Sequence, residues 1–166
     1  MNNVYILCVD DDPADLEQVK SDLAEFEGTF PIRMTGSAEE ARKILGEIKE
    51  EGSRVGLIIC AHILPEESGI DLLISINHDL GMLDTRKLLI TRNAGLEETI
   101  KGLNEGRLNY YLPKPWQTEQ LTNAVREQLT EYFIRIRKNP MDCIDKLDSM
   151  RIFEAIHKGL IPIESN

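Results

Sequence analysis

An apolar run meets three consecutive acidic residues in the stretch Val4-Tyr5-Ile6-Leu7-Cys8-Val9-Asp10-Asp11-Asp12-Pro13. Its first six residues show no polar alternation, which is typical of a strand buried on both faces in a parallel sheet. Pro13 suits the first turn of a helix, with Asp12 as its N-cap. In open α/β sheets the functional crevice lies beyond the carboxyl ends of the strands, so we expect the aspartates to face it.

The three adjacent carboxylates admit two interpretations. Like charges this close oppose each other's ionisation unless a cation joins them, and hard oxygen ligands suit Mg²⁺. The plainer interpretation is an acidic helix start that the helix dipole stabilises. The residues that follow the other predicted strands decide between the two.

The rest of the chain alternates strands with helices. We expect strands at residues 4–9, 30–35, 55–60, 87–91 and 108–112, and helices at 13–26, 38–51, 69–79, 95–104 and from 118 onward. Each crossover is long enough for a right-handed parallel connection. The pattern predicts an α/β fold, a doubly wound five-stranded parallel sheet with the flavodoxin-like order 2-1-3-4-5.

The last predicted helix is longer than it needs to be to cover the sheet. Its apolar positions recur every four residues and reach Phe133, and Asn139-Pro140 then breaks it. We therefore expect a domain at 1–133 and a helical extension and tail at 134–166. The distal apolar face is a homodimer seam, a linker to an output module, or a face covered by the tail.

Composition narrows the classes of partner. The 166 residues carry a formal net charge of −10, which opposes binding to nucleic acid or anionic lipid. No apolar run approaches the roughly 20 residues of a membrane span, and no signal peptide is evident. The three cysteines lack metal-ligand spacing and fit reduced thiols, so we expect a cytoplasmic protein.

Side chains that could bind a phosphoryl group stand at the ends of several predicted strands. Three aspartates follow the first, Ala61 ends the third, Thr91 ends the fourth and Lys114 follows the fifth. A cation site, a hydroxyl donor and an ammonium at one crevice are suited to binding a phosphoryl group.

These blocks resemble a bacterial response-regulator receiver domain over roughly residues 4–132. The resemblance rests on four segments, Ile6 to Pro13, Leu57 to Leu73, Leu88 to Thr91 and Tyr111 to Trp116. It implies a two-component phosphorelay function without enzymatic turnover. The implied partner is a histidine kinase or a phosphotransfer protein.

The resemblance also implies roles for individual residues. Asp10, Asp11 and the backbone carbonyl of Ile63 would bind Mg²⁺. Thr91 and Lys114 would hold the phosphoryl group. Two further implications are an aromatic switch at Tyr111 and a cis peptide bond between Lys114 and Pro115.

Ala61 departs from the family pattern. It occupies the position of the aspartate that accepts the phosphoryl group, four residues before Pro65. A methyl group cannot form an acyl phosphate, so we expect no phosphorylation there and a weakened Mg²⁺ site. A milder departure is Arg92, where the family usually has a small residue.

Two interpretations of Ala61 remain open. The chain is either a naturally degenerate receiver that acts by binding alone, or an ordinary receiver in which the acceptor has been substituted. The survival of the other pocket residues favours the second. A remote alternative is a haloacid-dehalogenase-like phosphatase, which would use Asp10, Asp12, Thr91 and Lys114 but needs a further acidic pair after a later strand.

Overall fold

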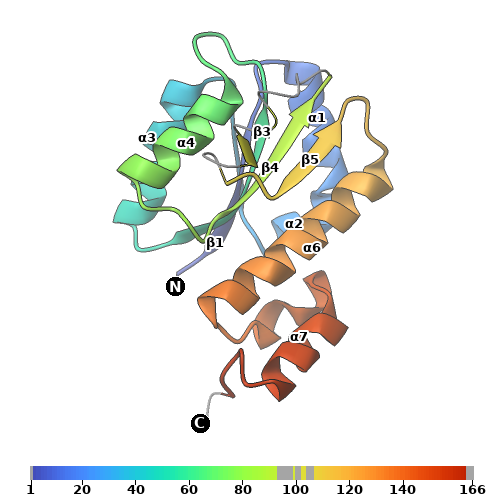
Figure 1. Ribbon diagram of the computed structural model, residues 1–166. Coiled ribbons are helices and arrows are strands. Elements are labelled where there is room, and N and C mark those ends of the chain that lie inside the picture. Colours follow the sequence, from blue (N-terminus) through green and yellow to red (C-terminus); the bar gives the residue numbers. More distant parts are fainter. Residues whose placement is uncertain (1, 93–98, 100–101, 104–106, 164–166) are drawn as a thin grey trace.

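The computed structural model describes residues 2–92, 99, 102–103 and 107–163, and its centre is a five-stranded parallel sheet (Figure 1). The strand order is β2-β1-β3-β4-β5, which confirms the predicted doubly wound α/β topology. The strands are β1 (Val4–Val9), β2 (Ile32–Thr35), β3 (Arg54–Ala61), β4 (Arg86–Thr91) and β5 (Tyr110–Pro113).

Helices cover both faces of this sheet, and a tail packs beyond it. The helices are α1 (Pro13–Asp22), α2 (Ala24–Glu27), α3 (Ala38–Glu50), α4 (Gly69–Asp79) and α6 (Thr118–Ile136), and the tail contains the 3₁₀ helix η1 (Met141–Lys146) and α7 (Ser149–His157). In Figure 1, α3 and α4 lie on one side of the sheet, and α1 and α6 lie on the other. The helix expected at 95–104 falls almost entirely outside the described residues.

Three of the predicted boundaries were wrong. The helix from Pro13 breaks at Leu23, whose ψ of 12° ends α1 before α2 begins. The second strand starts at Ile32 because the N–H of Phe30 donates to a turn and Pro31 has no N–H. The fifth strand starts late because the side chain of Asn109 accepts the N–H of Lys87, in place of a backbone carbonyl.

Side chains alternate across the sheet and build two cores. One core, on the α1 and α6 side, takes Ile6, Cys8, Leu57, Ile59, Leu88 and Ile90. The other, on the α3 and α4 side, takes Leu7, Val9, Ile58, Cys60 and Leu89. Because successive strand residues point to opposite faces, burial on both sides requires an unbroken apolar run.

Side chains cap the starts of α1 and α3, and Asp12 is the N-cap that the sequence predicted. The Asp12 carboxylate accepts the N–H of Ala14 at 2.9 Å, and the Ser37 hydroxyl accepts the N–H of Glu40 at 3.2 Å. The Glu40 carboxylate does not close a reciprocal capping box. It accepts instead from the Thr35 hydroxyl at 2.6 Å and so ties α3 to the end of β2.

The tail covers the distal part of α6, which is the third of the alternatives considered. Tyr132 and Phe133 are buried in the same core as Leu147, Ile152, Ala155 and Ile161. The Thr130 hydroxyl accepts the N–H of Asp148 at 2.9 Å, and Arg151 pairs with Glu131 at 2.6 Å. The tail is therefore joined to α6 by apolar contact, a hydrogen bond and an ion pair (Figure 1).

The cysteine thiols are all free and buried, as the apolar runs around two of them indicated. Burial, with a smaller contribution from nearby carboxylates, raises the pKa of Cys8 to about 12 and that of Cys143 to about 11. At neutral pH both thiols are protonated and poorly reactive. Within the described part of the chain, no helix has the length and apolarity needed to cross a membrane.

We expect Ile152→Ala to lower the free energy of unfolding by about 2–4 kcal/mol, because it leaves a cavity between α7 and α6. Urea denaturation followed by circular dichroism measures this loss. The matched control is Met150→Ala, whose side chain is exposed on the same helix and should cost less than about 0.5 kcal/mol. Equal costs for the two variants would show that α7 is not docked as described.

Candidate functional site

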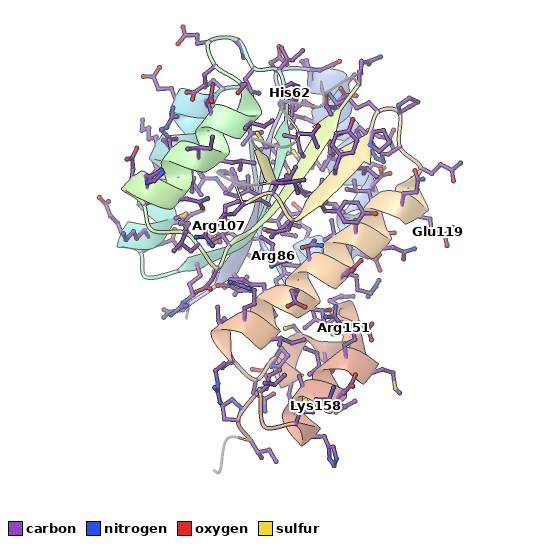
Figure 2. The ribbon with its side chains drawn as sticks, viewed as in Figure 1. His62, Arg86, Arg107, Glu119, Arg151 and Lys158 are labelled. Carbon is purple, nitrogen blue, oxygen red and sulfur yellow. The ribbon has the colours of Figure 1, made fainter. Side chains whose placement is uncertain are left out.

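A pocket of about 290 Å³ opens at the carboxyl ends of β1, β3, β4 and β5. The predicted residues that line it are Asp10, Asp11, Ala61, Ile63, Thr91 and Lys114. Parallel strands end at the same edge of the sheet, so residues far apart in the sequence meet there. In Figure 2, His62 marks this edge.

Lys114 is held between two carboxylates. Its Nζ lies 2.8 Å from Asp10 Oδ2 and 2.7 Å from Asp15 Oδ2. The side chains are only 10% exposed for Lys114 and Asp10 and 17% for Asp15. Burial opposes the charged form, but the hydrogen bonds that the ammonium donates to both carboxylates, together with their negative charges, outweigh it and raise the pKa of Lys114. The ammonium is therefore retained at neutral pH.

Asp15 is the site residue that the sequence analysis missed. It lies in the first turn of α1, three residues after the N-cap Asp12, so it comes back to the side of the helix that faces the pocket. That spacing was visible in the sequence. It does not identify a partner, because an acidic residue in a first helical turn is ordinary.

Backbone hydrogen bonds hold the ends of the strands together. The N–H of Asp10 donates to Thr35 O at 3.0 Å, and the N–H of Lys114 donates to Thr91 O at 2.8 Å. Asp10 Oδ1 accepts the N–H of Asp12 at 3.0 Å, which orients the carboxylate. The Lys114–Pro115 peptide bond is cis, as the resemblance implied.

The buried Asp22, at the end of α1, anchors the segment after Lys114. Its carboxylate accepts from Trp116 Nε1 at 2.7 Å, Thr118 Oγ1 at 2.8 Å and Gln18 Nε2 at 2.7 Å. These bonds join α1 to the loop between β5 and α6. The helix α1, which carries Asp15, and the segment that follows Lys114 are therefore fixed relative to one another.

Gly69 allows the loop that carries Ile63 to pass close to the end of β3. A Cβ at this position would lie 1.9 Å from Ala61 O, so only glycine fits where α4 starts against the end of β3. The N–H of Gly69 donates to His62 O at 2.6 Å, and Ile63 forms an isolated bridge with Ser68.

Tyr111 is not part of the pocket. It lies on β5 opposite Leu89 in the strand register, and it is 37% exposed. His62 and Arg92 do line the pocket beside the predicted residues. The guanidinium of Arg92 therefore brings a second positive charge to the edge that Lys114 occupies.

The donor set suits Mg²⁺ in kind. Two carboxylates, Asp10 and Asp11, and the carbonyl of Ile63 are the hard oxygens that Mg²⁺ takes together with water. The ammonium of Lys114 already contacts one oxygen of Asp10. In the part of the chain that the structure describes, no three acidic, histidine or cysteine side chains are grouped as metal ligands.

This sheet order, with an acidic cluster after β1, a hydroxyl at the last residue of β4 and a lysine after β5, is that of the CheY-like fold. Residues 6–126 match the response regulator receiver domain, and the chain belongs to that family.

Individual relatives agree with this assignment. The chain is 33% identical, over 127 residues, to the hydrogenase transcriptional regulatory protein HoxA of Bradyrhizobium diazoefficiens, and 26% identical, over 122 residues, to HoxA of Cupriavidus necator. The matches cover 76% and 74% of this chain but only 24% and 23% of the two regulators. The chain thus spans about a quarter of the length of the curated relatives it matches.

Solved structures show the same fold. The signal receiver domain of an HD domain-containing protein from Pseudomonas fluorescens Pf-5 has a TM-score of 0.71 and 26% identity, covering 82% of this chain and 93% of that one. The receiver domain of a LuxO repressor protein from Vibrio parahaemolyticus has a TM-score of 0.63 and 17% identity. It covers 98% of this chain and 99% of its own, so the similarity of fold includes the tail.

We expect Asp15→Asn and Lys114→Met to be coupled, because the two side chains share a poorly exposed ion pair. A double-mutant cycle by urea denaturation should give a coupling free energy of about 1–3 kcal/mol. The control cycle replaces Asp15→Asn with Glu17→Gln, on an exposed position of α1, and should give a coupling near zero. Additive effects of Asp15→Asn and Lys114→Met would contradict the pairing.

Proposed function

We propose that this receiver domain signals by contact with partner proteins and takes no phosphoryl group at position 61. The observation that supports the proposal is the placement of Ala61, which is 4% exposed and lines the pocket beside Asp10, Thr91 and Lys114. A phosphoryl acceptor needs a nucleophilic oxygen, and the Ala61 side chain has none.

In a form of this protein with aspartate at position 61, a histidine kinase or a phosphotransfer protein would donate the phosphoryl group. Thr91 would hydrogen-bond it, and Lys114 would provide a positive charge. Tyr111, which is exposed on β5, would then follow inward as the switch residue, and we propose that its exposed position belongs to the inactive arrangement. With Ala61, the chain stays in this arrangement.

We assign Mg²⁺ to Asp10, Asp11 and the carbonyl of Ile63, with reduced affinity. The ion supplies positive charge that neutralises phosphoryl oxygens when it is bound. The carboxylate missing at position 61 removes one negative charge from the pocket, and Lys114 competes for Asp10.

A second candidate is a naturally degenerate receiver that acts only as a binding module. Asp15 favours it, since its carboxylate gives Lys114 a partner that does not depend on an acidic side chain at position 61. Under both candidates this chain acts by protein contact. They differ only in whether the pocket could still be phosphorylated if position 61 were an aspartate.

Further assignments follow from the class of protein. We propose a cytoplasmic protein with no catalytic turnover. The phosphatase alternative needs another strand after Lys114, and the described residues have none beyond β5. A homodimer through the tail would use Met150 and Phe153, since Tyr132 and Phe133 are buried under the chain's own residues.

We expect Ala61→Asp to gain one phosphoryl group on incubation with acetyl phosphate and Mg²⁺, because the rest of the pocket is assembled around position 61. Intact mass spectrometry measures the gain. The unmodified chain and Ala61→Asn, which matches aspartate in shape but lacks the nucleophile, should gain nothing. Failure of Ala61→Asp would favour the degenerate receiver, and uptake by the unmodified chain would refute the proposal.

Mg²⁺ binding gives a separate prediction. Restoring one carboxylate beside Asp10 and Asp11 should strengthen binding by roughly 1–4 kcal/mol, or at least about fivefold. Isothermal titration calorimetry with MgCl₂ compares the unmodified chain, Ala61→Asp and the neutral Ala61→Asn. Equal affinity in all three would show that position 61 does not face the ion.

A further inference from the structure

A second hollow lies at the opposite end of the sheet from the aspartate pocket. It has a volume of about 420 Å³, and Arg86, Arg107 and Arg135 line it together with Leu83 and Leu103. Figure 2 shows Arg86 and Arg107 close to one another at this end, while His62 marks the other. The hollow joins the start of β4, the residues before β5 and the distal part of α6.

The three guanidinium groups have few acidic partners. Arg86 Nε donates to the side-chain oxygen of Gln128 at 2.9 Å, which is a neutral acceptor. Among the described residues, the only carboxylate within 4 Å of any of the three is that of Asp84, 3.8 Å from Arg135. Both members of that pair are largely exposed, so water screens it.

Four of the other arginines are paired with nearer carboxylates. Arg42 and Arg151 contact Glu67 and Glu131, and the pairs Arg33–Glu47 and Arg126–Glu25 lie within 3.5 Å. The chain has 29 acidic residues against 19 basic ones, so carboxylates are abundant. Arg86, Arg107 and Arg135 therefore bring three weakly paired cations to one hollow of an otherwise acidic molecule, and Glu131 and Glu127 act on Arg86 through longer-range charge interaction.

A buried lysine, which does not line the hollow, is a fourth cation near these arginines. Lys87 is fully buried, and its Nζ donates to Met82 O at 2.9 Å and Thr85 O at 2.6 Å. Burial, followed by the charges of Arg86, Arg107 and Arg135, lowers the pKa of Lys87 to about 8. The four cations therefore repel one another, and an anion in the hollow would relieve that repulsion.

The rim of the hollow is apolar. Leu83 is 48% exposed and Leu103 is 54% exposed, and both line the hollow beside the guanidinium groups. A small inorganic anion would pair with the arginines and leave these leucines in water. A polypeptide with carboxylates and aliphatic side chains would complement both kinds of surface.

We propose that this hollow binds an acidic segment of a partner protein, whose carboxylates pair with Arg86, Arg107 and Arg135 and whose aliphatic side chains cover Leu83 and Leu103. Arginine suits this role because its planar guanidinium binds a carboxylate through two parallel hydrogen bonds. The inference deepens the proposed function, since it locates one surface through which the domain contacts a partner.

The probe is a short fluorescein-labelled peptide of alternating Glu-Glu and Leu-Leu pairs, and fluorescence anisotropy measures its dissociation constant. We expect the variant Arg107→Gln/Arg135→Gln, which changes only exposed side chains, to weaken binding at least about tenfold, or 1.4 kcal/mol. The control variant Lys43→Gln/Lys49→Gln removes the same charge from exposed positions of α3 and should change binding less than about twofold.

Methyl chemical shifts provide the second measurement. Addition of the peptide should shift the methyl signals of Leu83 and Leu103 and leave those of the buried Leu7 and Leu45 unchanged. The proposal is overturned by undetectable peptide binding at low salt, or by equal weakening in the two double variants. It is also overturned if inorganic tripolyphosphate displaces the peptide while the rim leucines remain unshifted, because the site would then bind small polyanions.

This test is independent of the phosphorylation test. The arginines lie at the opposite end of the sheet from position 61, so loss of peptide binding would leave phosphoryl uptake by Ala61→Asp unaffected. Equally, failure of Ala61→Asp to take up a phosphoryl group would leave the expected affinity of the arginine-lined hollow for the peptide unchanged.

Discussion

Burial of the parallel sheet on both faces is the constraint on which the rest of this structure depends. Each strand must supply apolar side chains to two cores, one under α1 and α6 and the other under α3 and α4. Polar side chains are thereby confined to the ends of the strands. Both polar sites therefore lie at strand ends, the pocket at the carboxyl end of the sheet and the arginine-lined hollow at the opposite end.

At the carboxyl end, the described lining of the pocket has four carboxylates and two cationic side chains, Arg92 and Lys114. Lys114 satisfies Asp10 and Asp15, and the backbone around Asp10 and Thr91 holds the strand ends in place. The pair formed with Asp15 gives the ammonium a second carboxylate partner besides Asp10.

The tail extends the core of the domain beyond the sheet. Ile152 and Ala155 pack against Tyr132 and Phe133, and the bond from Asp148 to Thr130 fixes the start of α7. The free energy of burying these side chains makes the tail part of the folded domain. It also removes most of the apolar surface that α6 would otherwise present to a partner.

The sequence by itself determined the strand order, the doubly wound topology and the pocket edge, because apolar runs and terminal polar residues are local patterns. It also indicated the cis Lys114–Pro115 bond through the resemblance. The partners of Lys114, the anchoring role of Asp22 and the grouping of Arg86, Arg107 and Arg135 were decided only by the tertiary structure. Each of these depends on side chains from separate elements meeting in space, and no periodicity along one element encodes such a contact.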